Sequence, residues 1–379
     1  MAKYEFSAPM PYKIEDIDSL LDINNKVEKS RITSLYAALP ACCDLFSGFE
    51  QNRNFDEHSE WDYWKRLIEH TIENGCDFIY LLNSPRPLDI DSPDFPGKIE
   101  KLEKLLEALK STGTDKLRIA SPQLQSYIGA HHSEFKVYAS TSMEYKTIWE
   151  YQNFIFFHPE VKQIVPSHDI NKNFPMLAVL REKHPDIQIE IMLNEGCLQG
   201  CPHRNYHASS SFRHTIINDD ICLSNGYYSA GCSQITGKYP IQSLVIGTHI
   251  FPWELDAYTD IGINNFKLVG RDANNFKDCI YRYTLYLKGA DDIKNIKDCS
   301  LASFVHHMKQ SAVIQQMKVR DYKKYMPDIK HFVKYGHLCS SRCGYSCRYC
   351  YNCAEKMQKI FKDRQKALQS ANISPCTID

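Results

Sequence analysis

The chain has 379 residues, of which 43% are hydrophobic and 24% charged, values typical of a globular protein. It has no apolar run long enough for a transmembrane helix and no N-terminal signal pattern, so we expect a cytoplasmic protein. The formal net charge of −1 gives no argument for or against nucleic-acid binding. This length suits one large α/β domain with an appendage, or two ordinary domains.

In chain order, residues 1–30 are predicted to be a polar lead-in with a short helix at Ile14–Leu21. Eight short apolar runs then alternate with segments of helical spacing. The predicted strands are Ile32–Leu39, Phe78–Leu82, Leu117–Ala120, Phe135–Ala139, Gln163–Val165, Ile187–Leu193, Leu244–Gly247 and Asn265–Val269. This alternation predicts an α/β fold, a TIM-like (β/α)8 barrel over residues 31–289. An open doubly wound sheet is the alternative, although no G-x-G-x-x-G follows any strand.

Two segments interrupt the alternation of strands and helices. About fifty residues separate the sixth and seventh predicted strands, far more than an ordinary connection with its helix. This predicts a long insertion after strand 6, at about 197–240. The second segment, 290–379, follows the last barrel helix and is predicted to be a helical, Cys-rich C-terminal extension.

The fifteen cysteines are the outlier of the composition. Disulfide frameworks belong to small secreted chains, so clustered thiols in this chain are expected to bind a metal or an iron–sulfur cluster. Nine of the cysteines form two groups, which are Cys197, Cys201, Cys222 and Cys232, and then Cys339, Cys343, Cys347, Cys350 and Cys353.

The first group lies at the end of the sixth predicted strand and in the insertion that follows it. Four thiolates suit zinc or a 4Fe–4S cluster. The missing C-x2-C knuckles and the position at a barrel mouth favour the cluster, and four unconnected cysteines are the alternative. Cys42 and Cys43, after the first predicted strand, could replace a member.

The second group contains Cys347-x2-Cys350-x2-Cys353, the spacing of three ligands of a ferredoxin-type cluster, with Cys343 or Cys339 available as the fourth. A second cluster or a zinc ion therefore remains open here. Cys343-x3-Cys347-x2-Cys350 also imitates the signature of radical S-adenosylmethionine enzymes. Those enzymes place the motif after their first barrel strand, whereas here it lies near the end of the chain.

Several polar residues follow predicted strands and are candidates for catalysis. A charge buried at a barrel mouth is costly unless it is paired or serves a ligand. An ion pair of Glu195 with Lys267 or Arg271 is the structural alternative to substrate binding. Neither H-E-x-x-H nor G-x-S-x-G is present, so protease motifs are missing. The candidates are Glu195, His249, Lys267, Arg271, Asn194 and His168.

Three stretches together resemble the peptidase U32 family. Phe266–Arg271 reads FKLVGR and is followed by Tyr281-Arg282-Tyr283, which is similar to the family's K-x-x-G-R and Y-R signature. Val137–Thr141, with Asn153 a helix later, resembles the family's strand that ends in a Ser-Thr pair. The strand before Cys197 occupies the place of the strand before the family's first cluster cysteine.

The resemblance implies a barrel and a 4Fe–4S cluster held by four cysteines. Relatives include O2-independent hydroxylases that act on transfer RNA, ribosomal RNA or a quinone precursor, with prephenate as oxygen donor. Cys197 matches best, whereas Cys201, Cys222 and Cys232 follow the idea without the family's intervals. The usual H-G-x-x-C is Asn194-Glu195-Gly196-Cys197 here, so the substrate and donor are not carried over. The second cysteine group is outside the family pattern.

Two hypotheses follow. The first is an iron–sulfur enzyme that hydroxylates, or otherwise modifies by a redox reaction, an RNA, a peptide or a small aromatic molecule. Lys267, Arg271 and His249 would then bind a carboxylate co-substrate such as prephenate. The second is a metal-stabilised binding or assembly protein for RNA or a partner subunit, since the lysine-rich stretch 306–337 has interleaved aromatic residues. A solvated amphipathic helix also explains that stretch, and a protease is the third possibility.

Overall fold

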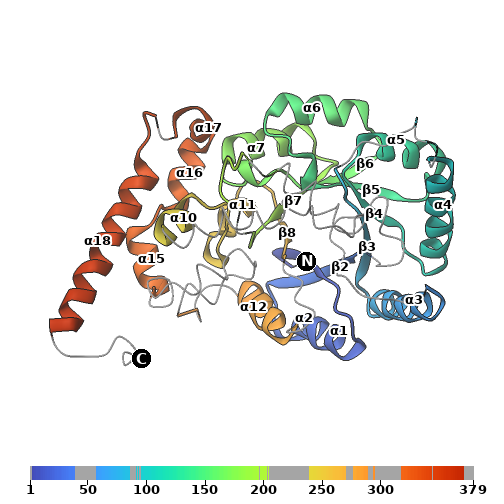
Figure 1. Ribbon diagram of the computed structural model, residues 1–379, viewed down its shortest axis with the longest axis horizontal. Coiled ribbons are helices and arrows are strands. Elements are labelled where there is room, and N and C mark those ends of the chain that lie inside the picture. The colour runs from blue at the N-terminus through green and yellow to red at the C-terminus, as the bar shows by residue number, and fades with distance from the viewer. Residues whose placement is uncertain are drawn as a thin grey trace.

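The computed structural model of the chain is an eight-stranded barrel with helices around it and a helical C-terminal extension on one side (Figure 1). The structure describes residues 2–38, 57–85, 91, 93, 95–195, 197–202, 204, 239–269, 276–288, 293–294, 317–343 and 345–370. All strand pairs are parallel, and β1 pairs with both β2 and β8, which closes the barrel. The predicted TIM-like (β/α)8 fold is confirmed.

The barrel strands follow one another around the barrel in sequence order. They are β1 (Tyr4–Pro9), β2 (Ser30–Ala37), β3 (Asp77–Leu82), β4 (Lys116–Ile119), β5 (Lys136–Ala139), β6 (Val161–Ile164), β7 (Gln188–Met192) and β8 (Asn265–Lys267). Side chains alternate between the two faces of each strand. On β7, Ile189 and Ile191 belong to the main hydrophobic core, while Glu190 between them is buried and ion-paired. The barrel interior is therefore unusually polar.

The helices cover the outside of the barrel, and all but α10 share the main core with the strands. They are α1 (Ile14–Leu21), α2 (Ile23–Lys26), α3 (Glu57–Glu73), α4 (Phe95–Ser111), α5 (Pro122–His131), α6 (Ile148–Phe157), α7 (Phe174–Lys183), α10 (Pro240–Ile246), α11 (Asp256–Thr259) and α12 (Phe276–Lys288). Helix α5 begins as its sequence predicts, because Ser121 caps it and Pro122 occupies its first turn.

Two of the predicted strands need correction. The barrel begins at Tyr4 and not near Ile32, because residues expected to be a lead-in form β1, which is hydrogen-bonded between β2 and β8. The run Leu244–Gly247 is not a strand, since Pro240–Ile246 forms α10. One strand was missed and one helix was predicted as a strand, so the predicted number of strands is still eight. The sixth predicted strand is β7. The expected helix at Ile14–Leu21 is confirmed as α1.

The C-terminal extension packs against the barrel. Its elements are α15 (Val319–Tyr325), α16 (Ile329–Tyr335), η7 (Gly336–Leu338), α17 (Cys339–Arg342) and α18 (Tyr349–Ser370). Figure 1 shows α18 beside α10 and α15 at the edge of the molecule. Within the described parts of the chain, no helix is both long and apolar enough to cross a membrane. The extension and the barrel share a second core, whose residues include Ile241, Leu244, Val245, Phe251, Tyr322, Ala354, Met357 and Phe361.

Candidate functional site

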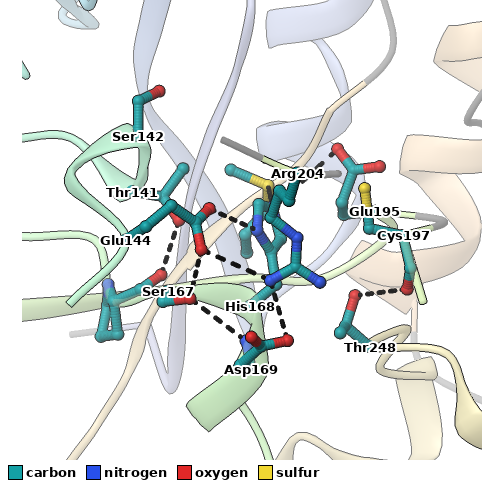
Figure 2. Close-up of polar contacts among 12 residues, drawn as sticks. Thr141, Ser142, Glu144, Ser167, His168, Asp169, Glu195, Cys197, Arg204 and Thr248 are labelled. Atoms are coloured by element: carbon teal, nitrogen blue, oxygen red, sulfur yellow. Dashed lines mark hydrogen bonds and ion pairs between the residues drawn. The ribbon is translucent and has the colours of Figure 1, made fainter. Parts of the chain in front are cut away.

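Polar side chains from three consecutive connections meet at one end of the barrel (Figure 2). The connections are η2 (Thr141–Met143) after β5, η3 (His168–Ile170) after β6, and the loop after β7. All three follow carboxyl ends of parallel strands, where α/β barrels place their active sites. The polar residues that define this site are Glu144, His168, Asp169 and Arg204, which we call the mouth cluster.

Glu144 is placed by a strained turn. The Ser140 hydroxyl accepts the Ser142 N–H at 3.3 Å, and the Thr141 hydroxyl donates to the Pro166 carbonyl at 2.8 Å. Glu144 follows with φ of 57°, the single non-glycine residue of the described ranges with a positive φ. A left-handed backbone at a residue with a side chain costs about 1–2 kcal/mol and persists where the surroundings require it.

The Glu144 carboxylate is 7% exposed and has three polar neighbours. Ser167 Oγ donates to Glu144 Oε2 at 2.8 Å, Arg204 Nη1 lies 3.5 Å from the same oxygen, and His168 Nδ1 lies 3.8 Å from Oε1. Burial alone would raise the pKa of Glu144, but His168 and Arg204 together outweigh burial and hold the pKa below its usual value. Glu144 is therefore an anion at neutral pH.

Arg204 and Asp169 fasten the loop after β7 to the loop after β6. Arg204 Nη1 lies 2.8 Å from Asp169 Oδ1, and Arg204 Nη2 donates to the Leu198 carbonyl at 2.5 Å. The Gly200 N–H also donates to Asp169 Oδ1, at 2.7 Å. Burial raises the pKa of Asp169, but the Arg204 charge, the Gly200 N–H and Lys146 outweigh burial and hold the pKa below its usual value. The mouth cluster thus contains a buried, fully charged clamp.

His168 lies between two carboxylates. Its Nδ1 faces Glu144, its Nε2 lies 4.0 Å from Glu195 Oε2, and Nε2 is 3.0 Å from the Met192 sulfur. The side chain is 8% exposed. An imidazole that is flanked by carboxylates at a barrel mouth can take a proton from one side and deliver it to the other. This is the acid–base chemistry that the cluster offers.

Cys197 and Cys201 lie beside this acid–base group, and both are partly exposed. The Cys197 carbonyl accepts both the N–H and the hydroxyl of Thr248 at 3.1 Å, which fixes the loop to the end of α10. Burial and the nearby Glu195 raise the pKa of Cys197 well above its usual value. The partner cysteines Cys222 and Cys232, like Cys42 and Cys43, lie outside the described residues.

Thiols are soft donors and suit zinc, copper(I) or iron–sulfur clusters. The two described thiols share one loop and interact electrostatically, as expected of two members of a ligand set. Among the residues that the structure describes, no three His, Cys, Asp or Glu side chains are placed as a metal site. A complete ligand set at the mouth would therefore need a residue from outside the described ranges.

Asn194 and Lys267 lie on the β7–β8 side of the mouth. The Asn194 amide exchanges two hydrogen bonds of 2.7 Å with the backbone of Val269, so it ties the end of β7 to the segment after β8. Lys267 is 5% exposed, and its Nζ lies 4.2 Å from the centre of the Tyr36 ring. Arg271 lies outside the described residues.

His249 lies apart, in the layer between the barrel and its helices. Its Nε2 is 3.0 Å from the Tyr286 hydroxyl on α12, and its ring packs on Phe251. Burial, with a smaller effect from Lys172, lowers the pKa of His249 to about 3. Of the sequence-predicted residues, the structure brings His168, Glu195 and Cys197 together, whereas His249 is a neutral packing group.

Sequence reasoning did not find Glu144, Ser167, Asp169 or Arg204. Two signals were available. Ser167 and Asp169 flank His168, and Glu144 comes three residues after Thr141, which was noted at a strand end. Arg204 carries no local signal, because its role depends on partners that are 35 and 60 residues away.

Comparison with known proteins gives distant similarities. No family model matches the chain. A protein from Methanocaldococcus jannaschii, described as an uncharacterized protease, is 23% identical over 261 residues and covers 68% of this chain and 72% of that protein. Among solved structures, a U32 peptidase has a TM-score of 0.45 at 11% identity, over 72% of this chain and 94% of its own. An O-GlcNAc hydrolase from Thermobaculum terrenum has a TM-score of 0.35 at 7% identity, over 98% and 96%. Both TM-scores are too low to indicate a shared function.

Proposed function

We propose, since the chain is a divergent member of the peptidase U32 family, that it is a cytoplasmic iron–sulfur enzyme performing O2-independent hydroxylation or a related redox modification. The observation that carries this proposal is the position of Cys197 and Cys201, two cysteines in the loop that the mouth cluster clamps. An RNA, a peptide or a small aromatic molecule is the proposed substrate class.

The residues present suit a cluster. The two thiols are soft donors at the carboxyl end of β7, and the loop that carries them is fastened at Arg204 and at Thr248. Cys222 and Cys232 would complete the set from the insertion. A 4Fe–4S cluster held by these four thiolates would supply a one-electron redox couple at the mouth.

The chain's own residues would manage protons and orientation. His168 would hold a proton at Nε2 on the Glu195 side, and the Glu144 carboxylate behind Nδ1 would stabilise the imidazolium. Lys267, and Arg271 from outside the described residues, would bind the carboxylate of a co-substrate such as prephenate. Asn194 would act as a positioning residue, since its amide is bound to the backbone.

Anaerobic purification followed by iron, sulfide and zinc analysis tests the proposal. We expect this cluster to contribute about four iron atoms per chain and a brown colour, and Cys197→Ser should lose those four iron atoms and their share of the colour. Cys76→Ala is the matched control, because Cys76 is a buried core residue at the start of β3. A colourless protein with stoichiometric zinc and no iron would overturn the proposal.

Two outcomes would favour other functions. Peptide hydrolysis is suggested by the description of the Methanocaldococcus jannaschii protein. It would replace our proposal if cluster-free protein cleaved a fluorogenic peptide library and His168→Gln abolished cleavage. A binding or assembly role for RNA or a partner subunit would be favoured if Cys197→Ser unfolded the chain. In that case no reversible cluster reduction would be seen by electron paramagnetic resonance.

A further inference from the structure

Four of the five C-terminal cysteines gather around one tight turn between α17 and α18. Cys339 begins α17, and its carbonyl accepts the N–H of Cys343 at 3.2 Å. Cys343 and Cys347 face each other as a single parallel bridge. The Arg342 carbonyl accepts three successive N–H groups, including that of Cys347 at 2.9 Å, and this closes the turn. Cys343 and Cys347 therefore lie side by side in this turn, and Cys339 is hydrogen-bonded to Cys343.

Cys350 completes the group from the first turn of α18. Cys347 lies in the turn just before this helix, three residues ahead of Cys350 in the sequence. Burial raises the pKa values of Cys350 and Cys339. The charges of Cys339, Cys343 and Cys353 raise that of Cys350 further, and the charges of Cys343 and Cys347 raise that of Cys339 further. Both Cys339 and Cys350 also pack against the barrel core.

Cys353 stands apart from these four. It is one turn further along α18, which places it about 4.5 Å further from the hairpin along the helix axis. Cys353 affects the pKa of Cys350, its neighbour on α18, and the charge of Lys356 on the same helix acts on Cys353 itself. Its spacing in the sequence suggests a metal ligand as strongly as that of Cys350 does, but in the fold Cys353 lies further from the turn.

We infer that the extension holds a tetrathiolate metal centre with Cys339, Cys343, Cys347 and Cys350 as ligands and Cys353 outside it. Four thiolates select zinc or an iron–sulfur cluster. The N-terminus of the 22-residue helix α18 and the nearby Lys172 both favour negative charge here. In the described ranges no three such side chains are placed as a metal site, so metal binding would require the sulfurs to move closer together. This inference is independent of the function proposed for the mouth.

The centre lies where the extension meets the barrel. Gly336, just before Cys339, packs so closely that a Cβ there would lie 2.1 Å from the Lys172 carbonyl oxygen. Lys172 belongs to the loop after β6 that also carries His168, and its Nζ lies 5.2 Å from the centre of the Phe332 ring. Beyond the centre, α18 packs on α10, whose end holds the Cys197 loop. A metal here would therefore brace two of the segments that build the mouth.

Metal retention in the full chain tests the inference. The background is the Cys197→Ser, Cys201→Ser double variant, which removes the ligands proposed at the mouth. One portion is incubated anaerobically with zinc, another with ferrous iron and sulfide, and both are desalted before metal analysis. We expect about one zinc or about four iron atoms per chain to be retained in one arm, which identifies the metal.

The ligand assignment is tested by two serine variants in the same background. Cys343→Ser should lose at least tenfold of the retained metal, whereas Cys353→Ser should retain it in full. Equal loss in both variants, or no stoichiometric metal in either arm, would overturn the inference. If the background does not fold, the same two variants are compared in the otherwise unchanged chain. The difference in metal content per chain between them is then the result, and no difference overturns the inference.

Discussion

Arg118 and Arg204 are both buried guanidinium groups that meet carboxylates, but different structures hold them. Arg118 projects from β4, where its Nη2 lies 2.8 Å from Glu190 on β7 and donates to Gln163 on β6 at 2.6 Å. Arg204 sits in a loop and bonds to Asp169, Glu144 and the Leu198 carbonyl. The hydrogen-bonded strands hold the Arg118–Glu190 pair in position, whereas the Arg204–Asp169 pair holds its own loop in position.

The difference shows in how fully each guanidinium is bonded. The Nε and Nη1 atoms of Arg118 have no hydrogen-bond partner in the described residues, and it faces the Tyr36 ring at 5.9 Å instead. Both terminal nitrogens of Arg204 are engaged, and its Nε alone has no hydrogen-bond partner in the described residues. Asp169 has further donors in Lys146 and Gly200. Arg118 is thus a stability element that a barrel can tolerate under-bonded, and Arg204 organises the candidate site.

The largest effect is expected from Arg118→Met. This change leaves Glu190, 2% exposed, as a buried charge without its cation, which costs about 3–5 kcal/mol of unfolding free energy. Urea denaturation measures it. The Arg118→Met, Glu190→Met double variant removes both charges and should recover most of the loss. If the double variant is as unstable as the single one, the pair is not what stabilises the barrel interior.

A smaller loss of stability, up to about 3 kcal/mol, is expected from Arg204→Met, because Glu144 and Asp169 keep other partners. The main effect should be local. The loop 197–204 should become sensitive to limited proteolysis, and metal bound through Cys197 should be lost. Arg118→Met is the control, and the two variants are compared under conditions that give them equal free energies of unfolding. Our comparison fails if both variants expose the loop equally.

The sequence predicted the barrel because most strands are continuous apolar runs separated by amphipathic helices. It missed β1, whose six residues include Ser7 and Pro9 and whose partners come from β2 and β8. Pairing over such distances has no local signal. The Leu244–Gly247 run suits a buried strand or a buried helical turn equally, and only Pro240 at the helix start distinguishes them.

The candidate site was predictable where a residue directly follows a strand, as His168 and Cys197 do. Glu144 was not, because its position depends on a left-handed turn that its residue type does not announce. Asp169 and Arg204 acquire their roles only when closure of the barrel brings two loops together. His249 was expected at the mouth because a neighbouring helix was read as a strand.

Gly336→Ala tests whether the extension braces the barrel. The new Cβ would meet the Lys172 carbonyl oxygen and the Asn173 backbone, neither of which can rotate away. We expect a loss of about 2 kcal/mol in urea denaturation and faster hydrogen exchange in α16 and η7. Gly97→Ala on α4 is the matched control, since nothing lies within 4 Å of its new Cβ. An unchanged Gly336→Ala variant would mean that the extension is not docked.

The smallest effect concerns His249 and pH. Its pKa of about 3 in the folded chain lies below the ordinary value of 6.5, because it is buried against Phe251 and Tyr286 with the Lys172 charge nearby. As the pH falls below 6.5, the unfolded chain binds a proton that the folded chain refuses, so stability decreases. Between pH 7.5 and 5.5 this amounts to about 1.4 kcal/mol. His249→Gln should lack this part of the pH dependence in urea denaturation at the two pH values. His337→Gln, at an exposed position, should keep it. An equal dependence of stability on pH in both variants would mean that another group causes it. His249 would then not be a neutral packing group.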